Sequence, residues 1–252
     1  MAGEKKEASV KVPAITLGFW VIKILATTLG ETGGDAVSMS LNLGYLIGTG
    51  IFMVLFVAAV FLQIRSTTFH PAVYWLTIIA STTIGTTLAD FATRSLGIGY
   101  AGGSALLLFL LLASLLIWHR DLGRVDVASV CMPKAELYYW LTIMFSQTLG
   151  TALGDWTADT AGLGYLGAAA IFSSLLLAVV GLHFFTHVSK TALFWGAFIL
   201  TRPLGAVVGD FLDKPVANGG LELSRYTATG VILLAIIALV YLLPQRAADK
   251  AH

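Results

Sequence analysis

Four short segments of the chain carry an aspartate just behind two small residues that are spaced four apart, within otherwise apolar stretches. The aspartates are Asp35, Asp90, Asp155 and Asp210. An ionisable group inside a membrane span is energetically costly and usually faces the bundle interior or a water-filled path. The repeated acids therefore indicate an ion path, or else polar anchors and salt-bridge partners near the outer ends of helices.

The first segment differs from the others because it contains a second acid. Glu31 precedes Asp35 by four residues, so the two carboxylates share one face of a helix. Thr28, Thr83 and Thr148 add hydroxyl oxygens to the repeated segments. Carboxylate and hydroxyl oxygens suit hard cations or protons. We expect an ion or proton site here, with Glu31 and Asp35 as the principal metal ligands.

Only two cations are expected at a comparable depth, Lys23 and Arg202. Against five acids they leave the interior short by three positive charges, and carboxylates that share a dehydrated site cannot all stay ionised without partners. Bound cations or protons must supply the difference. Both residues are predicted as internal counter-charges, Arg202 paired with a motif acid. For Lys23 the alternative is a side chain that reaches the inner membrane surface.

Pro203 follows Arg202 and is expected to free a backbone carbonyl one turn earlier and to kink or break its helix. A broken helix beside an intramembrane charge is a recurrent way to build an ion site in transporters. The fourth segment is therefore predicted to be irregular.

The composition fixes the class of protein. The chain has 252 residues, of which 57% are hydrophobic and 12% charged, as in membrane proteins. A net charge of +1 gives no reason to expect nucleic acid as a partner. Cys131 is the single cysteine, so no internal disulfide forms. Because no catalytic or dinucleotide motif occurs, we expect neither enzyme activity nor a cofactor.

The acidic segments belong to an internal repeat. Each unit opens with an aromatic pair, continues with the acidic motif and ends in a second apolar run, and the first three units place Gly-Tyr between the two. The first motif glycines are separated by 55, 65 and 55 residues, which indicates two paired halves. With about 20 residues per span, the sequence predicts an all-α bundle of eight transmembrane helices, built from four parallel two-helix repeats. The expected divisions are an N-terminal tail (1–12), two membrane halves (13–126 and 127–243) and a C-terminal tail (244–252).

The small residues before each aspartate predict how the helices pack. Pairs spaced four apart let helix backbones approach closely in lipid, where no hydrophobic force drives association. We therefore expect the first helix of each unit to pack centrally. The glycines concerned are Gly30, Gly34, Gly85, Gly150, Gly154, Gly205 and Gly209.

Charge in the loops predicts the topology. With eight spans, ten Lys and Arg residues lie on the side of the termini and three, Arg94, Lys214 and Arg225, on the other. The positive-inside rule then places both termini in the cytoplasm of a bacterial inner membrane. The aromatic pairs are expected at the inner membrane interface. Besides the lipid bilayer, the expected partners are a small cation and protons, and a homo-oligomer is possible.

Two resemblances follow from these motifs. The units, as in Tyr139-Trp140, Thr148 to Asp155 and Gly162 to Tyr165, resemble bacterial membrane proteins built from a fourfold "repeat of unknown function", which implies a multi-span inner-membrane protein. Locally, Glu31-Thr32-Gly33-Gly34-Asp35 is similar to the Glu-x-Gly-Asp signature of manganese/calcium–proton exchangers. That second resemblance implies acids that bind a divalent cation.

The sequence thus favours a secondary transporter that exchanges a small cation, such as Mn2+, for protons. A structural or interaction protein whose acids only hold helices together is the main alternative, and a cation channel is a third.

Overall fold

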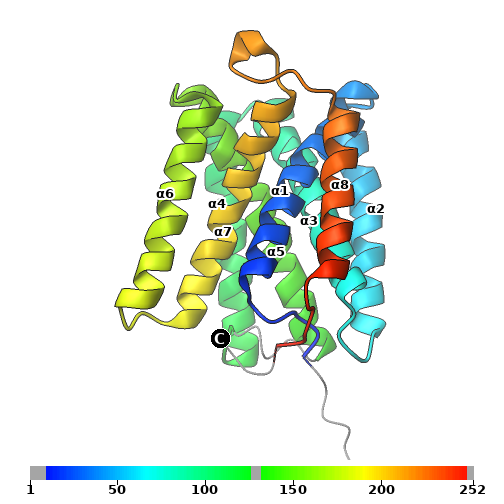
Figure 1. Ribbon diagram of the computed structural model, residues 1–252, viewed down its shortest axis with the longest axis vertical. Coiled ribbons are helices and arrows are strands. Elements are labelled where there is room, and N and C mark those ends of the chain that lie inside the picture. Colours follow the sequence, from blue (N-terminus) through cyan, green and yellow to red (C-terminus); the bar gives the residue numbers. More distant parts are fainter. Residues whose placement is uncertain (1–9, 126–131, 249–252) are drawn as a thin grey trace, which may run out of the picture.

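The chain forms an all-α bundle in a computed structural model that describes residues 10–125 and 132–248. The predicted boundary between the halves and parts of both tails lie outside these residues. Within them, each of the eight predicted apolar runs forms one long helix (Figure 1). The helices are α1 (Leu17–Asp35), α2 (Gly44–Arg65), α3 (Pro71–Asp90), α4 (Gly99–Leu122), α5 (Pro133–Asp155), α6 (Gly164–Phe185), α7 (Lys190–Asp213) and α8 (Arg225–Leu242).

Local sequence sets several helix starts. The Thr16 hydroxyl accepts a hydrogen bond from the amide of Phe19 and caps α1. Pro71 and Pro133 occupy the first turns of α3 and α5, where a missing amide hydrogen costs nothing. The Gly-Tyr elements begin the even-numbered helices α2, α4 and α6, and their glycines adopt positive φ angles that other residues rarely tolerate.

The four odd-numbered helices form a closed inner ring. In order around it, α1 contacts α3, α3 contacts α5, α5 contacts α7, and α7 returns to α1. Each even-numbered helix packs outside the ring on the inner helix of the following unit, and α8 closes the circle on α1 (Figure 1). The repeat thus supplies one inner and one outer helix per unit.

The seams of the ring depend on the motif glycines. A β-carbon added at Gly30 would lie 2.3 Å from the Thr82 hydroxyl, and one added at Gly205 would lie 2.1 Å from the Thr27 hydroxyl. At Gly150 it would lie 2.4 Å from the Arg202 side chain. A threonine or arginine of one inner helix therefore packs directly against the glycine of its neighbour, an approach that only a small residue permits.

One end of the bundle, which we call the terminal end, holds the chain's described termini and the starts of the inner helices (Figure 1). There Phe19, Tyr74, Tyr139 and Phe194 are buried and contact their aromatic neighbours in other helices. These side chains therefore face the interior of the ring, and the depth of the aromatic pairs at the inner membrane interface stays a prediction. They fill the ring because four inner helices bring their apolar first turns together.

A segment before α1 ties the terminal end together. The Lys11 ammonium lies 2.6 Å from Glu136 of α5 and donates to the carbonyl of Ile64 in α2 at 3.0 Å. The Gln63 amide donates back to the Lys11 carbonyl. Pro13 pairs with Ala247 in an antiparallel bridge. We call residues 10–16 and 244–248 the terminal strap.

The helices are consistent with a multi-pass membrane protein. Within the described residues, six helices are long and apolar enough to cross a membrane: α2, α3 with its extension to Ser95, α4, α6, α7 and α8. The remaining two, α1 and α5, are less apolar because glycine, threonine and other polar residues interrupt their apolar positions. α7 continues unbroken through Pro203, so the predicted break is wrong, and the proline instead packs against Gly150 of α5.

Candidate functional site

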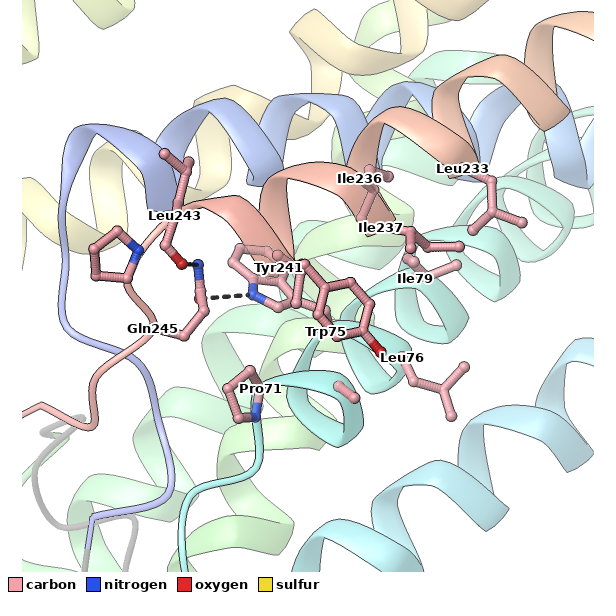
Figure 2. Close-up of a pocket in the computed structure, with 13 residues that line it drawn as sticks. Pro71, Trp75, Leu76, Ile79, Leu233, Ile236, Ile237, Tyr241, Leu243 and Gln245 are labelled. Atoms are coloured by element: carbon pink, nitrogen blue, oxygen red, sulfur yellow. Dashed lines mark hydrogen bonds between the residues drawn. The ribbon is translucent and has the colours of Figure 1, made fainter.

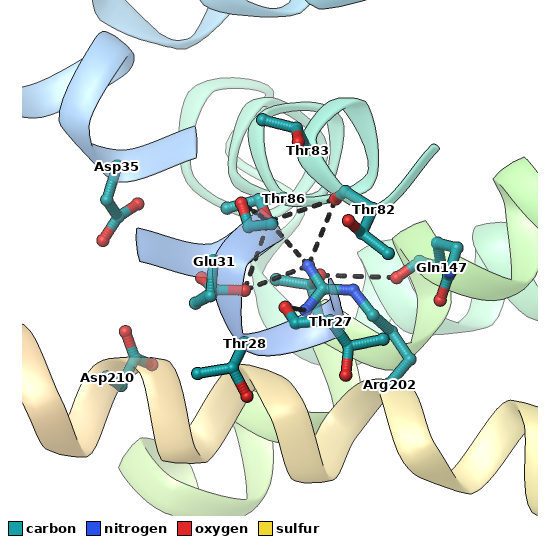
Figure 3. A network of polar contacts seen from close by, with 12 residues as sticks. Thr27, Thr28, Glu31, Asp35, Thr82, Thr83, Thr86, Gln147, Arg202 and Asp210 are labelled. Carbon is teal, nitrogen blue, oxygen red and sulfur yellow. Dashed lines mark hydrogen bonds and ion pairs between the residues drawn. The ribbon is translucent and has the colours of Figure 1, made fainter. Parts of the chain in front are cut away.

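An arginine and a glutamate meet inside the ring. The Arg202 guanidinium of α7 lies 3.0 Å from the Glu31 carboxylate of α1, and both side chains are buried. It also donates to the Thr86 hydroxyl of α3 at 2.6 Å, and Thr86 in turn donates to Glu31 (Figure 3). Since α3 and α7 lie on opposite sides of the ring, Arg202 crosses its centre. The sequence prediction that Arg202 pairs with a motif acid is thereby confirmed.

Lys23 of α1 lies nearer than Arg202 to the aromatic residues of the terminal end. Its side chain is fully buried, so the predicted alternative of a cation at the membrane surface is wrong. The ammonium lies 3.5 Å from the Gln147 amide oxygen of α5 and 4.1 Å from the centre of the Phe198 ring. No carboxylate of the described residues forms an ion pair with it. Lys23 therefore does not neutralise Glu31, and that role belongs to Arg202.

The four repeated aspartates gather at the opposite end of the ring, which we call the acidic end. Arg94 lies 2.9 Å from Asp90, four residues before it, and 3.3 Å from Asp155 of the next unit. Lys214 lies 3.0 Å from Asp210, four residues before it, and also pairs with Asp35 of the first unit. Each of these two cations thus bridges two neighbouring repeats.

The sequence predicted Arg94, Lys214 and Arg225 on the side away from the termini, but it did not predict that all three pair with aspartates. Asp213 is buried and lies 2.5 Å from Arg225. With these residues included, the ring holds six buried carboxylates and five cations, of which Lys23 has no carboxylate partner among the described residues, so the predicted deficit of three positive charges falls to one. In units two and four a cation follows the aspartate by four residues, and this spacing brings the two side chains together along a helix. That spacing is the signal that could have predicted the pairs.

Three carboxylates, Glu31 of the buried ion pair and two aspartates of the acidic end, form a tighter cluster. One oxygen each of Glu31, Asp35 and Asp210 lie within 4.8 Å of one another, and all three residues are buried. Gly209 permits this, because a β-carbon there would lie 2.6 Å from that of Glu31. The second Asp35 oxygen, Oδ1, has no hydrogen-bond partner among the described residues. We call these residues the carboxylate cluster, and its donor set suits a hard divalent cation.

Lys214 remains charged within this arrangement. Burial lowers the pKa of its ammonium, but the carboxylates of Asp210, Asp35 and Asp213 more than offset burial and hold the pKa well above its usual range. The cluster is therefore occupied by a cation that the chain itself provides.

The other residues predicted for the site lie nearby without joining the cluster. Thr28, Thr83 and Thr148 donate their hydroxyl protons to carbonyls one turn earlier in their own helices. Asp90 and Asp155 form the Arg94 group, but their charges lie close enough to interact with those of the cluster. Thr86 is the threonine that contacts a carboxylate of the cluster.

A polar pocket of about 650 Å³ reaches the site from the acidic end. Its walls include Asp210, Lys214, Arg94, Asp159 and Tyr165. A second hollow, of about 670 Å³, lies between α3 and α8 and is almost wholly apolar (Figure 2). Among its lining residues, Gln245 accepts a hydrogen bond from the Trp75 indole at 3.2 Å. Of these two hollows, only the polar one meets the carboxylate cluster.

The fold and site define an all-α, multi-pass membrane protein in which four tandem repeats enclose buried ion pairs. The family described as "Repeat of Unknown Function (DUF347)" matches residues 18–69, 73–121, 138–189 and 193–246, one segment per structural unit. The chain belongs to this family, as its motifs predicted. Neither the curated proteins nor the solved structures gave a match to the chain.

Proposed function

We propose that the protein is a secondary transporter that exchanges a small cation, a divalent metal ion such as Mn2+, for protons through the carboxylate cluster. In this proposal all eight helices span a bacterial inner membrane as four parallel units. Both termini face the cytoplasm, as the ten-to-three distribution of Lys and Arg favours. The acidic end then faces the periplasm.

The observation that carries the proposal is the carboxylate cluster at the base of the polar pocket. Glu31, Asp35 and Asp210 offer oxygens within 4.8 Å of one another, and Asp210 also lines the pocket. A cation in the pocket therefore meets Asp210, whose carboxylate lies next to the other two buried acids. Helix packing alone does not require a hollow at this place.

The chemistry follows from desolvation and charge. Buried carboxylates near one another resist simultaneous ionisation, so a site without a bound cation gains protons. A divalent cation needs the deprotonated acids and displaces those protons on binding. In the state observed, Arg202 neutralises Glu31, whereas the single charge of Lys214 is shared by Asp35 and Asp210 and leaves one negative charge for a proton to neutralise. Exchange between these states gives coupled movement of cation and proton.

One observation favours the structural alternative. Glu31 and each of the four repeated aspartates have a cationic partner, which is what acids that merely lock helices together require. An open channel is less compatible with the ring, because Arg202, Lys23 and the aromatic residues fill its centre.

Flux measurements on purified protein in liposomes separate these functions. Asp35→Asn and Asp210→Asn are expected to lower Mn2+ flux at least tenfold. Asp159→Asn serves as the matched control, because Asp159 lines the same pocket but is exposed and outside the cluster. Loss of flux in the folded cluster variants alone supports transport. A parent without cation flux, with Asp→Asn variants that unfold, supports the structural function instead.

A further inference from the structure

The two cations at the acidic end are related by the repeat. Units two and four each place a cation four residues after their aspartate, Arg94 after Asp90 and Lys214 after Asp210. Each cation then reaches the aspartate of the following unit, Asp155 or Asp35. In both groups the Oδ1 atom of that second aspartate is buried and has no hydrogen-bond partner among the described residues. The ring thus contains two similar sites, one in each half.

Sequence differences make the two sites unequal. The Lys214 site includes Glu31 as a third carboxylate, and the corresponding position next to Asp155 is Thr151. The Arg94 site holds a guanidinium, which can bind two carboxylates at once in a fixed geometry, and which also lies 5.8 Å from the Tyr100 ring. An ammonium on a flexible stem has neither constraint. Of the two cations, Lys214 is the easier to displace.

The segment after α7 holds the backbone of Lys214 in place. The Lys214 carbonyl accepts a hydrogen bond from the amide of Glu222 at 2.9 Å, and Gly220 packs directly on it. At the other end of this segment, Arg225 is anchored by Asp213 at 2.5 Å and by Ser40 at 3.2 Å. The ammonium lies beside the polar pocket. A turn of the side chain towards this pocket would move the ammonium away from the carboxylate cluster while the backbone stays in place.

We propose that Lys214 is a tethered competitor for the transported cation: its ammonium occupies the carboxylate cluster in the empty transporter and withdraws into the polar pocket when a divalent cation binds. This inference rests on the proposed function and assigns the single divalent-cation site to the Lys214 half of the ring. Arg94 stays in place as the fixed counterpart.

The expected consequence is a reduced apparent affinity. When only a fraction of the molecules has a vacant cluster, the apparent dissociation constant for Mn2+ rises by the inverse of that fraction. Removal of the ammonium should therefore tighten binding and slow release. Since a bound ligand stabilises the folded protein, Mn2+ should also raise the thermal midpoint further in such a variant.

The test uses the full-length protein in detergent with Mn2+ as the probe. Lys214→Met is expected to bind Mn2+ at least tenfold more tightly than the parent, to gain more thermal stability from Mn2+, and to transport it more slowly. Arg94→Met removes the same charge from the other half, and its Mn2+ affinity is expected to change less than threefold. Lys214→Arg, which keeps the charge and the fold, should weaken Mn2+ binding because the guanidinium holds both carboxylates.

Three results overturn the inference. Equal Mn2+ affinity in Lys214→Met and the parent shows that the ammonium does not compete. Equal tightening in Lys214→Met and Arg94→Met shows a general effect of negative charge. If Lys214→Met fails to fold, a Mn2+ affinity of Lys214→Arg equal to that of the parent overturns the inference. A parent that neither binds nor transports Mn2+ marks failure of the proposed function itself, whereas the first three results leave transport intact.

Discussion

Arg202 and Glu31 show how a single pair of residues shapes the interior of this ring. Both side chains are buried, and their nitrogen and oxygen atoms lie 3.0 Å apart. Breaking a buried ion pair from one side leaves an uncompensated charge, at a cost of about 3–5 kcal/mol. Glu31→Gln and Arg202→Met are each expected to destabilise the folded protein by about this amount.

The double variant distinguishes coupling from two independent losses. Glu31→Gln combined with Arg202→Met leaves neither charge alone in the ring, so its loss of unfolding free energy should be clearly smaller than the sum of the single losses. Unfolding in detergent, followed by tryptophan fluorescence, measures all three. Strictly additive losses would show that the two residues do not depend on each other.

At the residue scale the sequence predicted the acids better than their partners. Asp35, Asp90, Asp155 and Asp210 stood out because charges are rare in apolar helices. Arg94 and Lys214 lie beyond the predicted spans, and only the structure shows that they turn back to bridge two units each. Lys11 lies in the predicted N-terminal tail, yet it forms a buried pair with a glutamate 125 residues away, for which no local pattern exists.

At the scale of helices, the ring depends on glycine at its seams. Gly205→Ala places a methyl group where the Thr27 hydroxyl now lies, 2.1 Å from the added carbon, so α1 and α7 must separate. Overpacking of this kind costs about 1–3 kcal/mol. We expect the thermal midpoint of Gly205→Ala to fall.

Gly196 in the same helix provides the control. A β-carbon there meets open space, and alanine favours a helix over glycine by up to about 1 kcal/mol. Gly196→Ala should keep or raise the thermal midpoint. Equal destabilisation by both substitutions would contradict the assignment of Gly205 to a seam.

A second prediction at the scale of helices concerns the terminal strap. Lys11→Met leaves Glu136 buried without its partner, and we expect a loss of about 3 kcal/mol, the lower end of the range for buried pairs because this pair lies at the end of the bundle. Lys134→Met is the matched control, since the Lys134–Asp121 pair at the same end is exposed and should contribute little. Similar thermal midpoints for the two variants would show that the strap does not hold the bundle together.

For the whole molecule, the repeat predicted most of the architecture. Periodicity along the chain gave the number of helices, and small residues spaced four apart gave the central packing of the odd-numbered helices. The repeat could not show that each outer helix packs on the following unit, because the apolar faces of the four outer helices are alike in sequence. Nor could it show that the aromatic pairs turn inwards, since interface and core positions both favour aromatic residues.

The proposed transport requires that the carboxylate cluster exchange protons for a divalent cation. The direct measurement is calorimetric titration of Mn2+ into the purified protein in two buffers that differ in ionisation enthalpy. Because binding requires deprotonated acids, we predict that the observed heat depends on the buffer through released protons, and that Asp35→Asn combined with Asp210→Asn abolishes this heat. Binding heat that is the same in both buffers, or that persists in the double variant, would contradict proton exchange at Glu31, Asp35 and Asp210.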